Sequence, residues 1–259
     1  MLIEQTLFGE VDKEVEAIEL LQKHEPPEGY YVCFSGGKDS VTVLDLVKRA
    51  GVKFEAHYHI VTIEPPELIP FIQENYPEVE LTIPDKDLYQ LIIEHGIPPL
   101  RQIRYCHREL KAPYGQGRFK VTGIRAEESR ARTLRKKYEV DKAGGGYFLN
   151  IIHDWTAAEV WEYIHKHKVK YCHLYDEGRK RLGCLFCPFG SQTQMQEDLK
   201  NYPDIAENLI IACQKAIDRR FERTGQRGKY PTGEEMFKRW IDHDKSKKHR
   251  EGGMPSLFE

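Results

Sequence analysis

The stretch that decides the fold reads Tyr30-Tyr31-Val32-Cys33-Phe34-Ser35-Gly36-Gly37-Lys38-Asp39-Ser40. It opens with a short apolar run, which is typical of a buried strand, and two glycines follow soon after that run ends. The apolar residues that come next fit one face of a helix: Val41, Val43, Leu44, Leu46 and Val47. The sequence therefore predicts a strand, a tight loop and a helix in immediate succession.

The same alternation extends outward from this stretch. Apolar residues at helical spacing predict a lead-in helix over 11–24. Further along the chain we predict strands over 54–63, 79–83 and 119–124, and helices over 68–75 and 88–94. Strands that alternate with helices pair in parallel through right-handed crossovers. The predicted fold class is therefore α/β, with an open, twisted, mainly parallel sheet and helices on both faces.

A region without this alternation follows. Thr156-Ala157-Ala158-Glu159 is a capping-box pattern that opens one more helix. The strand–helix rhythm stops at about residue 170, and two helical stretches follow over 203–223 and 232–241. We predict an α/β domain with its amino-terminal helix over 1–168, and a cysteine-containing segment with a helical carboxyl-terminal region over 169–259.

Composition and charge narrow the class of protein. Apolar residues make up 40% of the chain and charged residues 31%, which is typical of a folded protein. The net charge of −2 gives no general attraction to nucleic acid or to an anionic membrane. No run approaches the roughly 20 apolar residues of a membrane span, and the amino terminus lacks a secretory pattern. We expect a cytoplasmic protein, in which the six cysteines are thiols or metal ligands.

Residues 35–40 have the chemistry of a phosphate-binding loop. Glycines let backbone N–H groups face an anion, and the following helix adds its positive end. Lys38 supplies a full charge, although the glycine spacing is not that of a Walker A loop. A second strand end offers Gly123, Arg125 and Ser129, which we expect at the same edge of the sheet. The alternatives are a bland turn for the first segment and a solvated helix start for the second.

The loop matches the signature of the PP-loop ATP pyrophosphatases, and a larger set of blocks resembles the phosphoadenosine phosphosulfate reductase family. These blocks follow the family's order over about 30–199, at 34–40, 121–129, 151–163 and 171–188. The resemblance implies cleavage of ATP to AMP and pyrophosphate, and it places adenine near residues 61–67. We expect Lys38, Asp39 and Arg125 to be catalytic, with Mg²⁺ held through Asp39. The nucleotide-binding set is Ser35, Gly36, Gly37, Lys38, Asp39, Ser40, Gly123, Arg125 and Ser129.

The cysteines suggest a metal centre. Cys184-Leu185-Phe186-Cys187-Pro188 has the two-residue gap that lets two sulfurs face one metal, and its proline recurs in iron–sulfur ligand runs. Cys172 precedes this pair, and the resemblance places Cys106 beside them, where iron–sulfur members carry Cys-Cys and this chain has Cys106-His107. A [4Fe-4S] cluster is the first choice, structural zinc the second and a redox dithiol at Cys184 and Cys187 the third. The predicted ligands are Cys106, Cys172, Cys184 and Cys187, with His107 and His173 as further candidates, whereas Cys33 and Cys213 read as small buried hydrophobes.

The expected reaction follows from one departure from the family. Its reductases carry a nucleophilic cysteine in a carboxyl-terminal Glu-Cys-Gly motif, and this sequence has no cysteine after Cys213. The chain then resembles most closely the phage and mobile-element members and the PP-loop partner of DNA phosphorothioation. That resemblance implies adenylation of an acceptor, such as a nucleic acid, and displacement of AMP by sulfur from a donor such as a cysteine desulfurase. The alternative is a sulfonucleotide reductase.

A non-enzymatic function is the second alternative. In that case the chain is a nucleotide- or nucleic-acid-binding module with a structural metal. Basic runs are more often solvated faces than binding sites, and Glu127 and Glu128 reduce the charge of the first run. The two runs that support this alternative are Arg125, Arg130, Arg132, Arg135, Lys136 and Lys137, and Lys245, Lys247, Lys248 and Arg250.

Overall fold

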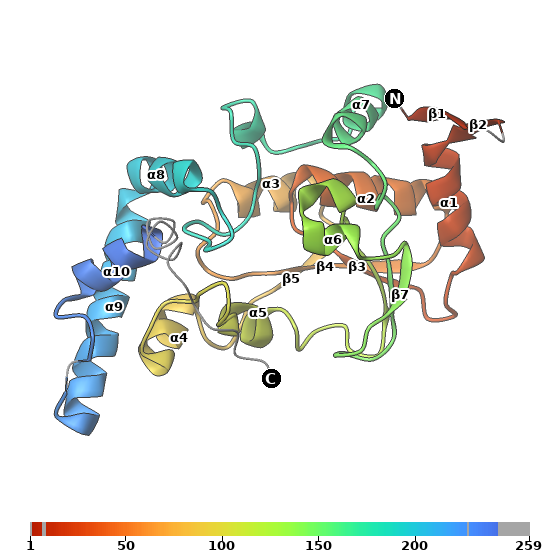
Figure 1. Cartoon of the computed structure of the whole chain (residues 1–259). Helices are drawn as coiled ribbons and strands as arrows, with labels where there is room; N and C mark the ends of the chain where they lie inside the picture. Colours follow the sequence, from red (N-terminus) through yellow and green to blue (C-terminus); the bar gives the residue numbers. More distant parts are fainter. Residues whose placement is uncertain (1, 7–8, 227, 243–259) are drawn as a thin grey trace, which may run out of the picture. The chain divides into compact units, whose positions relative to one another are not determined.

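A computed structural model describes residues 2–6, 9–226 and 228–242 (Figure 1). The described residues form two compact units. The first comprises the chain up to Ile60, Glu64–Ile83 and Leu110–Gly183, and the second comprises Val61–Ile63, Pro84–Glu109 and the chain from Cys184 onward. Residues 169–183, which the sequence assigns to the second domain, group with the first unit. No described helix has the length and apolar character to cross a membrane.

The first unit contains a six-stranded sheet among its described residues. The strands lie in the order β5-β4-β3-β6-β8-β7, and every neighbouring pair is parallel except β7 and β8. This arrangement confirms the predicted α/β fold with an open, mainly parallel sheet. The strands are β3 (Tyr30–Cys33), β4 (Phe54–His59), β5 (Val79–Thr82), β6 (Phe119–Val121), β7 (Tyr138–Val140) and β8 (Tyr147–Leu149).

The order of the strands reverses at β3. From β3 the chain proceeds outward through β4 to β5, and it then returns to place β6 on the other side of β3. In open parallel sheets the crevice at such a reversal, at the carboxyl ends of the strands, is where ligands bind. Ser35 follows β3 and Gly123 follows β6, so the two predicted phosphate segments come from the two strands that flank the reversal.

One face of the sheet is covered by four helices, α1 (Lys13–Lys23), α2 (Lys38–Ala50), α3 (Leu68–Asn75) and α7 (Ala157–His167). Successive strand side chains point to opposite faces, so Tyr30 and Val32 of β3 share this side. Both are fully buried, in one cluster with Leu44 of α2 and Ile164 of α7. Figure 1 shows α2 and α3 running along this side of the strands. The apolar helix faces that the sequence predicts therefore form the core.

The other face of the sheet carries polar and aromatic side chains. Tyr31 stacks on His57 with ring centroids 4.3 Å apart, and His59 stacks on Tyr114 at 4.1 Å. The Tyr31 hydroxyl lies 2.7 Å from Nε2 of His59. Burial, the largest effect, lowers the pKa of His59 to about 4, so this ring is neutral at physiological pH. This face carries a stack of rings, and the site predicted from the sequence lies at the carboxyl ends of the strands instead.

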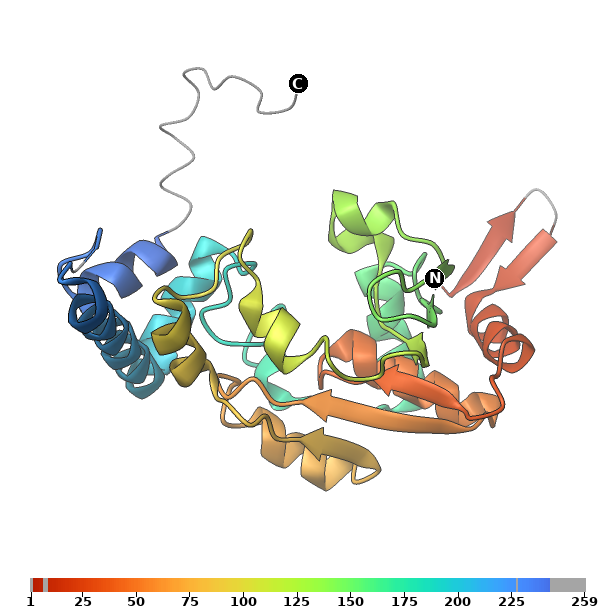
Figure 2. The same ribbon diagram turned by 90° about the horizontal axis from the view of Figure 1, so that it is seen from below.

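The second unit is helical. Its long helix α9 (Pro203–Thr224) contacts α4 (Leu88–His95) and α10 (Gly233–Ile241). The indole of Trp240 donates to the Pro99 carbonyl at 2.8 Å, which fixes α10 to the segment that follows α4. Figure 2 shows α9 and α10 adjacent at the blue end of the chain. The unit also contains α8 (Gln192–Asn201), and α5 (Tyr105–Leu110) lies at its boundary with the first unit.

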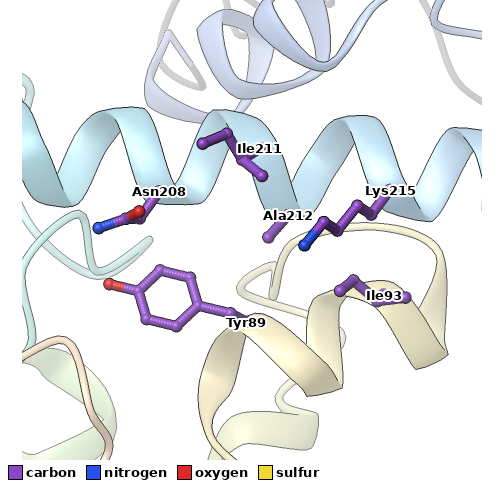
Figure 3. Close-up of a pocket in the computed structure, with 6 residues that line it drawn as sticks. All are labelled: Tyr89, Ile93, Asn208, Ile211, Ala212 and Lys215. Atoms are coloured by element: carbon purple, nitrogen blue, oxygen red, sulfur yellow. The ribbon is translucent and has the colours of Figure 1, made fainter.

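A hollow of about 330 Å³ lies between α4 and α9 (Figure 3). Half of its lining side chains are apolar, and a single cation, Lys215, reaches it. None of the site residues predicted from the sequence belongs to its lining. The lining residues are Tyr89, Ile93, Asn208, Ile211, Ala212 and Lys215.

Most predicted elements are confirmed. The helix predicted over 68–75 has these bounds in the structure, and the capping box at Thr156 opens α7 with both of its hydrogen bonds. The strand predicted over 54–63 ends at His59 and the strand predicted over 119–124 ends at Val121. The sequence did not predict β7, β8, α5, α6 (Arg130–Thr133) and α8, or the hairpin of β1 (Ile3–Thr6) and β2 (Gly9–Asp12).

Candidate nucleotide-binding site

The loop at residues 35–40 turns sharply between β3 and α2. Gly36 has a φ of 71°, and a Cβ at this position would lie 2.6 Å from the Leu68 side chain. Only glycine fits that combination of backbone and space. The Ser40 hydroxyl donates to the Gly37 carbonyl at 2.8 Å and accepts from the Ser35 N–H at 3.2 Å. The Ser40 side chain therefore stabilises the turn of the loop. The hydroxyl groups of Ser35 and Ser40 lie 3.1 Å apart.

The loop ends where α2 begins. Lys38 is the first residue of a helix of 13 residues, and Gly37 caps it without a side chain. The first amides of a helix lack partners inside the helix and carry its positive end, which suits an anion. The N–H of Lys38 donates to the hydroxyl of Tyr175 at 2.9 Å. The loop thus presents a helix terminus at the strand edge, as the sequence predicts.

Two cations, Lys38 and Arg125, meet on the carboxylate of Asp39 in the first turn of α2. Asp39 accepts from Nζ of Lys38 at 2.7 Å and from Nε of Arg125 at 2.5 Å. Lys38 is 8% exposed and Arg125 is 4% exposed. Burial lowers the pKa of Lys38, and the adjacent Asp39 carboxylate opposes that shift. Glu127 pairs with Arg125 as well, so two carboxylates balance the two cations, and the helix terminus supplies the positive potential that favours an anion.

The Arg125 guanidinium donates hydrogen bonds to three partners, which are Asp39, Glu127 and the Trp155 carbonyl. Gly123, at the end of β6, lies so close to the Asp39 backbone that a Cβ there would be 3.1 Å from its carbonyl. The Arg125 guanidinium also donates to Glu127 at 2.7 Å and to the Trp155 carbonyl at 3.5 Å. Glu127 in turn accepts from the Ala157 N–H, and this bond and Arg125 lower the pKa of Glu127. Arg125 therefore joins the loop to the start of α7.

The Ser129 side chain caps a short helix, and its assignment to the nucleotide-binding set stays a prediction. Its hydroxyl accepts from the Arg132 N–H at 3.3 Å and caps α6. Burial lowers the pKa of Arg132, the nearby Arg181 adds to this effect and Asp39 opposes it. The charges of these two arginines therefore act in the surroundings of the loop. The structure brings together Lys38, Asp39, Gly123 and Arg125, and it uses the Ser129 side chain as a helix cap.

The segment predicted to lie near adenine contains a buried acid. Glu64 is 8% exposed and accepts from the Tyr58 hydroxyl at 3.2 Å. Thr62 has a φ of 74°, which is uncommon for a β-branched residue and marks a constrained backbone. The assignment of residues 61–67 to adenine stays a prediction.

The predicted metal ligands fall in both units. Cys172 precedes the 3₁₀ turn η2 (His173–Tyr175) in the first unit, whereas Cys106, Cys184 and Cys187 belong to the second. In the part of the chain that the structure describes, no three His, Cys, Asp or Glu side chains gather as ligands for one ion. Because one of the four cysteines belongs to the first unit and three belong to the second, the four-thiolate set stays a prediction.

The turn between Cys184 and Cys187 is nevertheless unusual. Phe186 is fully buried and has a φ of 52°. Its N–H donates to Asp198 at 2.9 Å, and this carboxylate is 1% exposed. Strained residues of this kind persist only where the surroundings fix them, and they cluster at functional sites. The second unit therefore holds the turn between the two cysteines in a fixed conformation.

The basic run before β7 is partly neutralised. Arg132 pairs with Glu128, Arg135 with Glu139 and Lys137 with Glu16. Two residues of this run, Arg130 and Lys136, are exposed, and so is Lys142, which follows β7. These three have no ion-pair partner among the described residues. The other basic run, Lys245, Lys247, Lys248 and Arg250, lies outside the described residues.

Sequence reasoning missed Tyr175 and the carbonyl of Trp155. Tyr175 is 137 positions from Lys38 in the sequence, and no local pattern signals the contact. From the sequence, Glu127 only reduces the positive charge of the first basic run. In the structure its carboxylate accepts a hydrogen bond from Arg125. With these additions the site consists of a helix terminus, the buried cations Lys38 and Arg125, and the carboxylates of Asp39 and Glu127.

Comparisons with known proteins agree with this fold. The chain is 27% identical over 193 residues to an uncharacterised protein of Methanocaldococcus jannaschii, a match that covers 68% of this chain and 39% of that protein. It is 29% identical over 191 residues to the adenosine 5'-phosphosulfate reductase of Allochromatium vinosum, covering 68% of this chain and 74% of that protein. A crystal structure of the phosphoadenylyl-sulfate reductase of Candida auris has the same fold, with a TM-score of 0.52 and 19% identity over 65% of this chain and 88% of that one.

A family model described as the phosphoadenosine phosphosulfate reductase domain matches residues 29–189. The match begins just before β3, contains the loop, Gly123 and Arg125, and ends after Cys187. It thus spans more than half of the chain and every predicted site residue. The chain belongs to the phosphoadenosine phosphosulfate reductase domain family.

Proposed function

We propose that the chain binds ATP with its triphosphate on residues 35–40 and transfers the adenylyl group to an acceptor, releasing pyrophosphate. The observation that carries this proposal is the buried meeting of Lys38 and Arg125 on Asp39, at the point where the strand order reverses. A turn that binds no ligand does not need a buried cluster of charges. Placing two cations and a helix terminus at a ligand-binding edge supports the binding of a chain of phosphates.

The proposed step is a displacement at the α phosphorus. An acceptor oxygen forms a bond to that phosphorus, the bond to the oxygen bridging the α and β phosphates breaks, and pyrophosphate leaves with the electron pair. Lys38 and the loop amides face the negative charge on the leaving group, and Arg125 faces the charge on the α phosphate. We assign these two roles from the positions of the residues, since Lys38 begins α2 beside the loop amides and Arg125 follows β6.

A magnesium ion fits this arrangement through Asp39. Mg²⁺ is commonly held by one or two carboxylates together with substrate phosphates, so a single protein carboxylate suffices. Asp39 keeps 22% of its side chain exposed while it accepts from Lys38 and Arg125. When bound there, the ion would neutralise charge on the phosphate oxygens.

The purpose that we propose for adenylation is sulfur transfer. The AMP ester of the acceptor would be displaced by sulfur from a separate donor protein, such as a cysteine desulfurase, and AMP would leave. Support comes from the chain's family and from three exposed cations without ion-pair partners among the described residues, Arg130, Lys136 and Lys142. Such cations favour a polyanionic acceptor, which makes nucleic acid the first acceptor to test.

Sulfonucleotide reduction is the second candidate function. It is favoured by the match to the Allochromatium vinosum reductase, which covers 74% of that protein. A phosphosulfate group carries the same kind of charge as a diphosphate, so the loop suits it also. Reduction additionally needs a cysteine that attacks the sulfur and a thiol that regenerates it.

Product analysis separates the two candidates. We expect the wild-type chain, given ATP, Mg²⁺ and DNA or tRNA, to release pyrophosphate in step with adenylylation of the acceptor, as followed by ³¹P NMR, and to release AMP only when a sulfur donor is added. Adenylyl sulfate or phosphoadenosine phosphosulfate, with thioredoxin as reductant, should yield no sulfite. Sulfite release in that assay would favour the reductase, and ADP as the product of ATP would rule out adenylyl transfer.

The metal centre is proposed separately from this reaction. If the four predicted cysteines share a [4Fe-4S] cluster or a zinc ion, the protein purified without air should contain stoichiometric iron or zinc. Cys184→Ser should lose most of that metal, and Cys213→Ser, a buried residue of α9, should keep it. Metal analysis by mass spectrometry provides the readout. Wild-type protein without iron or zinc, or equal loss in both variants, argues against the four-thiolate set.

A further inference from the structure

Tyr175 touches the phosphate loop from outside the predicted set of residues. It ends the short turn η2, and its hydroxyl oxygen accepts from the N–H of Lys38 at 2.9 Å. A Cβ at Gly37 would lie 3.4 Å from the hydroxyl oxygen, so the loop leaves just enough space for this oxygen.

This oxygen occupies the kind of position in which a phosphate oxygen binds. Phosphate groups at helix N-termini accept from the first backbone amides of the helix. Lys38 is the first residue of α2, and its amide is already engaged by the phenol oxygen. Burial, the largest effect, raises the pKa of Tyr175 to about 12, so the group is a neutral hydroxyl at physiological pH. A neutral oxygen is a weaker acceptor for this amide than a charged phosphate oxygen.

The Tyr175 ring is held mainly by one neighbouring aromatic side chain. It packs edge-on against Trp161 of α7, with ring centroids 5.1 Å apart. Tyr171 packs on the same indole at the same distance and at a similar angle, but its hydroxyl donates to Asp176. The two tyrosines therefore share their packing and differ in whether the hydroxyl reaches the loop.

We propose that Tyr175 is a positioning residue whose hydroxyl oxygen holds the place of a phosphate oxygen in the nucleotide-free loop, and that a phosphate group of the ligand displaces it. The inference rests on the proposed binding of phosphates by residues 35–40. Displacement breaks the bond between the hydroxyl and the Lys38 N–H.

The test is the affinity for inorganic pyrophosphate, measured by calorimetry on the full chain. Tyr175→Phe removes the competing oxygen and keeps the ring, so pyrophosphate should bind about five-fold more tightly than to the wild type. Tyr171→Phe is the matched control and should bind like the wild type. Equal or weaker binding by Tyr175→Phe, with normal binding by the wild type, overturns the inference alone.

A fluorescence measurement keeps the test decisive if Tyr175→Phe fails to fold. Pyrophosphate added to the wild type should change the emission of Trp161, since the neighbouring ring moves, and Trp161→Phe should remove that change. A wild type that binds pyrophosphate without any response from Trp161 contradicts the displacement. A wild type that binds neither pyrophosphate nor ATP overturns the proposed function itself, and the inference with it.

Discussion

Replacing Arg125 with alanine is expected to lower pyrophosphate release about 1,000-fold, the scale on which a transition-state arginine acts in phosphoryl transfer. The change also removes the partner of Asp39 and Glu127, with its side chain only 5% exposed. Deleting one member of a buried charge cluster destabilises a protein, here by about 2–4 kcal/mol because Lys38 still faces Asp39. Activity assays and urea unfolding give the two quantities.

Two further variants separate catalysis from stability. Arg125→Lys keeps the charge but not the planar fork, so it should recover much of the stability and little of the activity. Arg118→Ala is the matched control, because Arg118 pairs at 2.9 Å with the exposed carboxylate of Glu55. Exposed pairs contribute about 0–1 kcal/mol, and its activity should equal that of the wild type. Full activity in Arg125→Ala would remove Arg125 from the proposed mechanism.

Replacing Lys38 with alanine is expected to lower pyrophosphate release at least about 100-fold and to leave the fold intact. The loss follows because Lys38 supplies the positive charge at the start of α2 that would face the leaving group. The fold should survive because Asp39 keeps its 2.5 Å bond to Arg125. Steady-state assays with ATP and a melting curve by circular dichroism test both parts.

Lys48→Ala is the matched control on the same helix. Its side chain is 41% exposed and pairs with Glu78, in the last turn of α2. Removing it changes the net charge of the protein by the same amount without touching the loop. If Lys38→Ala and Lys48→Ala lose activity to the same extent, the effect is one of general charge. If Lys38→Ala keeps the wild-type rate, the loop does not carry the reaction.

The sequence predicted the elements whose signals are local. β3 and α2 could be predicted because a buried strand reads as an apolar run and the helix as a periodic one. The helix α7 could be predicted because Thr156 and Glu159 cap each other within four residues. The position of Gly123 opposite the loop followed from parallel pairing alone, since carboxyl ends of parallel strands share an edge.

The remainder depends on contacts between distant residues. β7 and β8 have three residues each, too few for alternation to show, and Tyr138 and Tyr147 in them are partly exposed. Ser129 follows a strand end and also precedes a helical turn, where serine is a common cap. The structure shows the cap, and the part of Ser129 in nucleotide binding stays a prediction. The bond from Lys38 to Tyr175 joins two segments with no shared pattern.

The central claim is that the triphosphate of ATP lies on residues 35–40, and amide NMR of the wild-type chain tests it most directly. The ligand is an ATP analogue in which a methylene group joins the α and β phosphates, so that it binds without being cleaved. We expect the amide signals of Gly36, Gly37 and Lys38 to shift most, and we expect Lys38→Ala to lose the binding. An analogue that binds while these amides keep their free positions, or that shifts the residues around Lys215 instead, would contradict the claim.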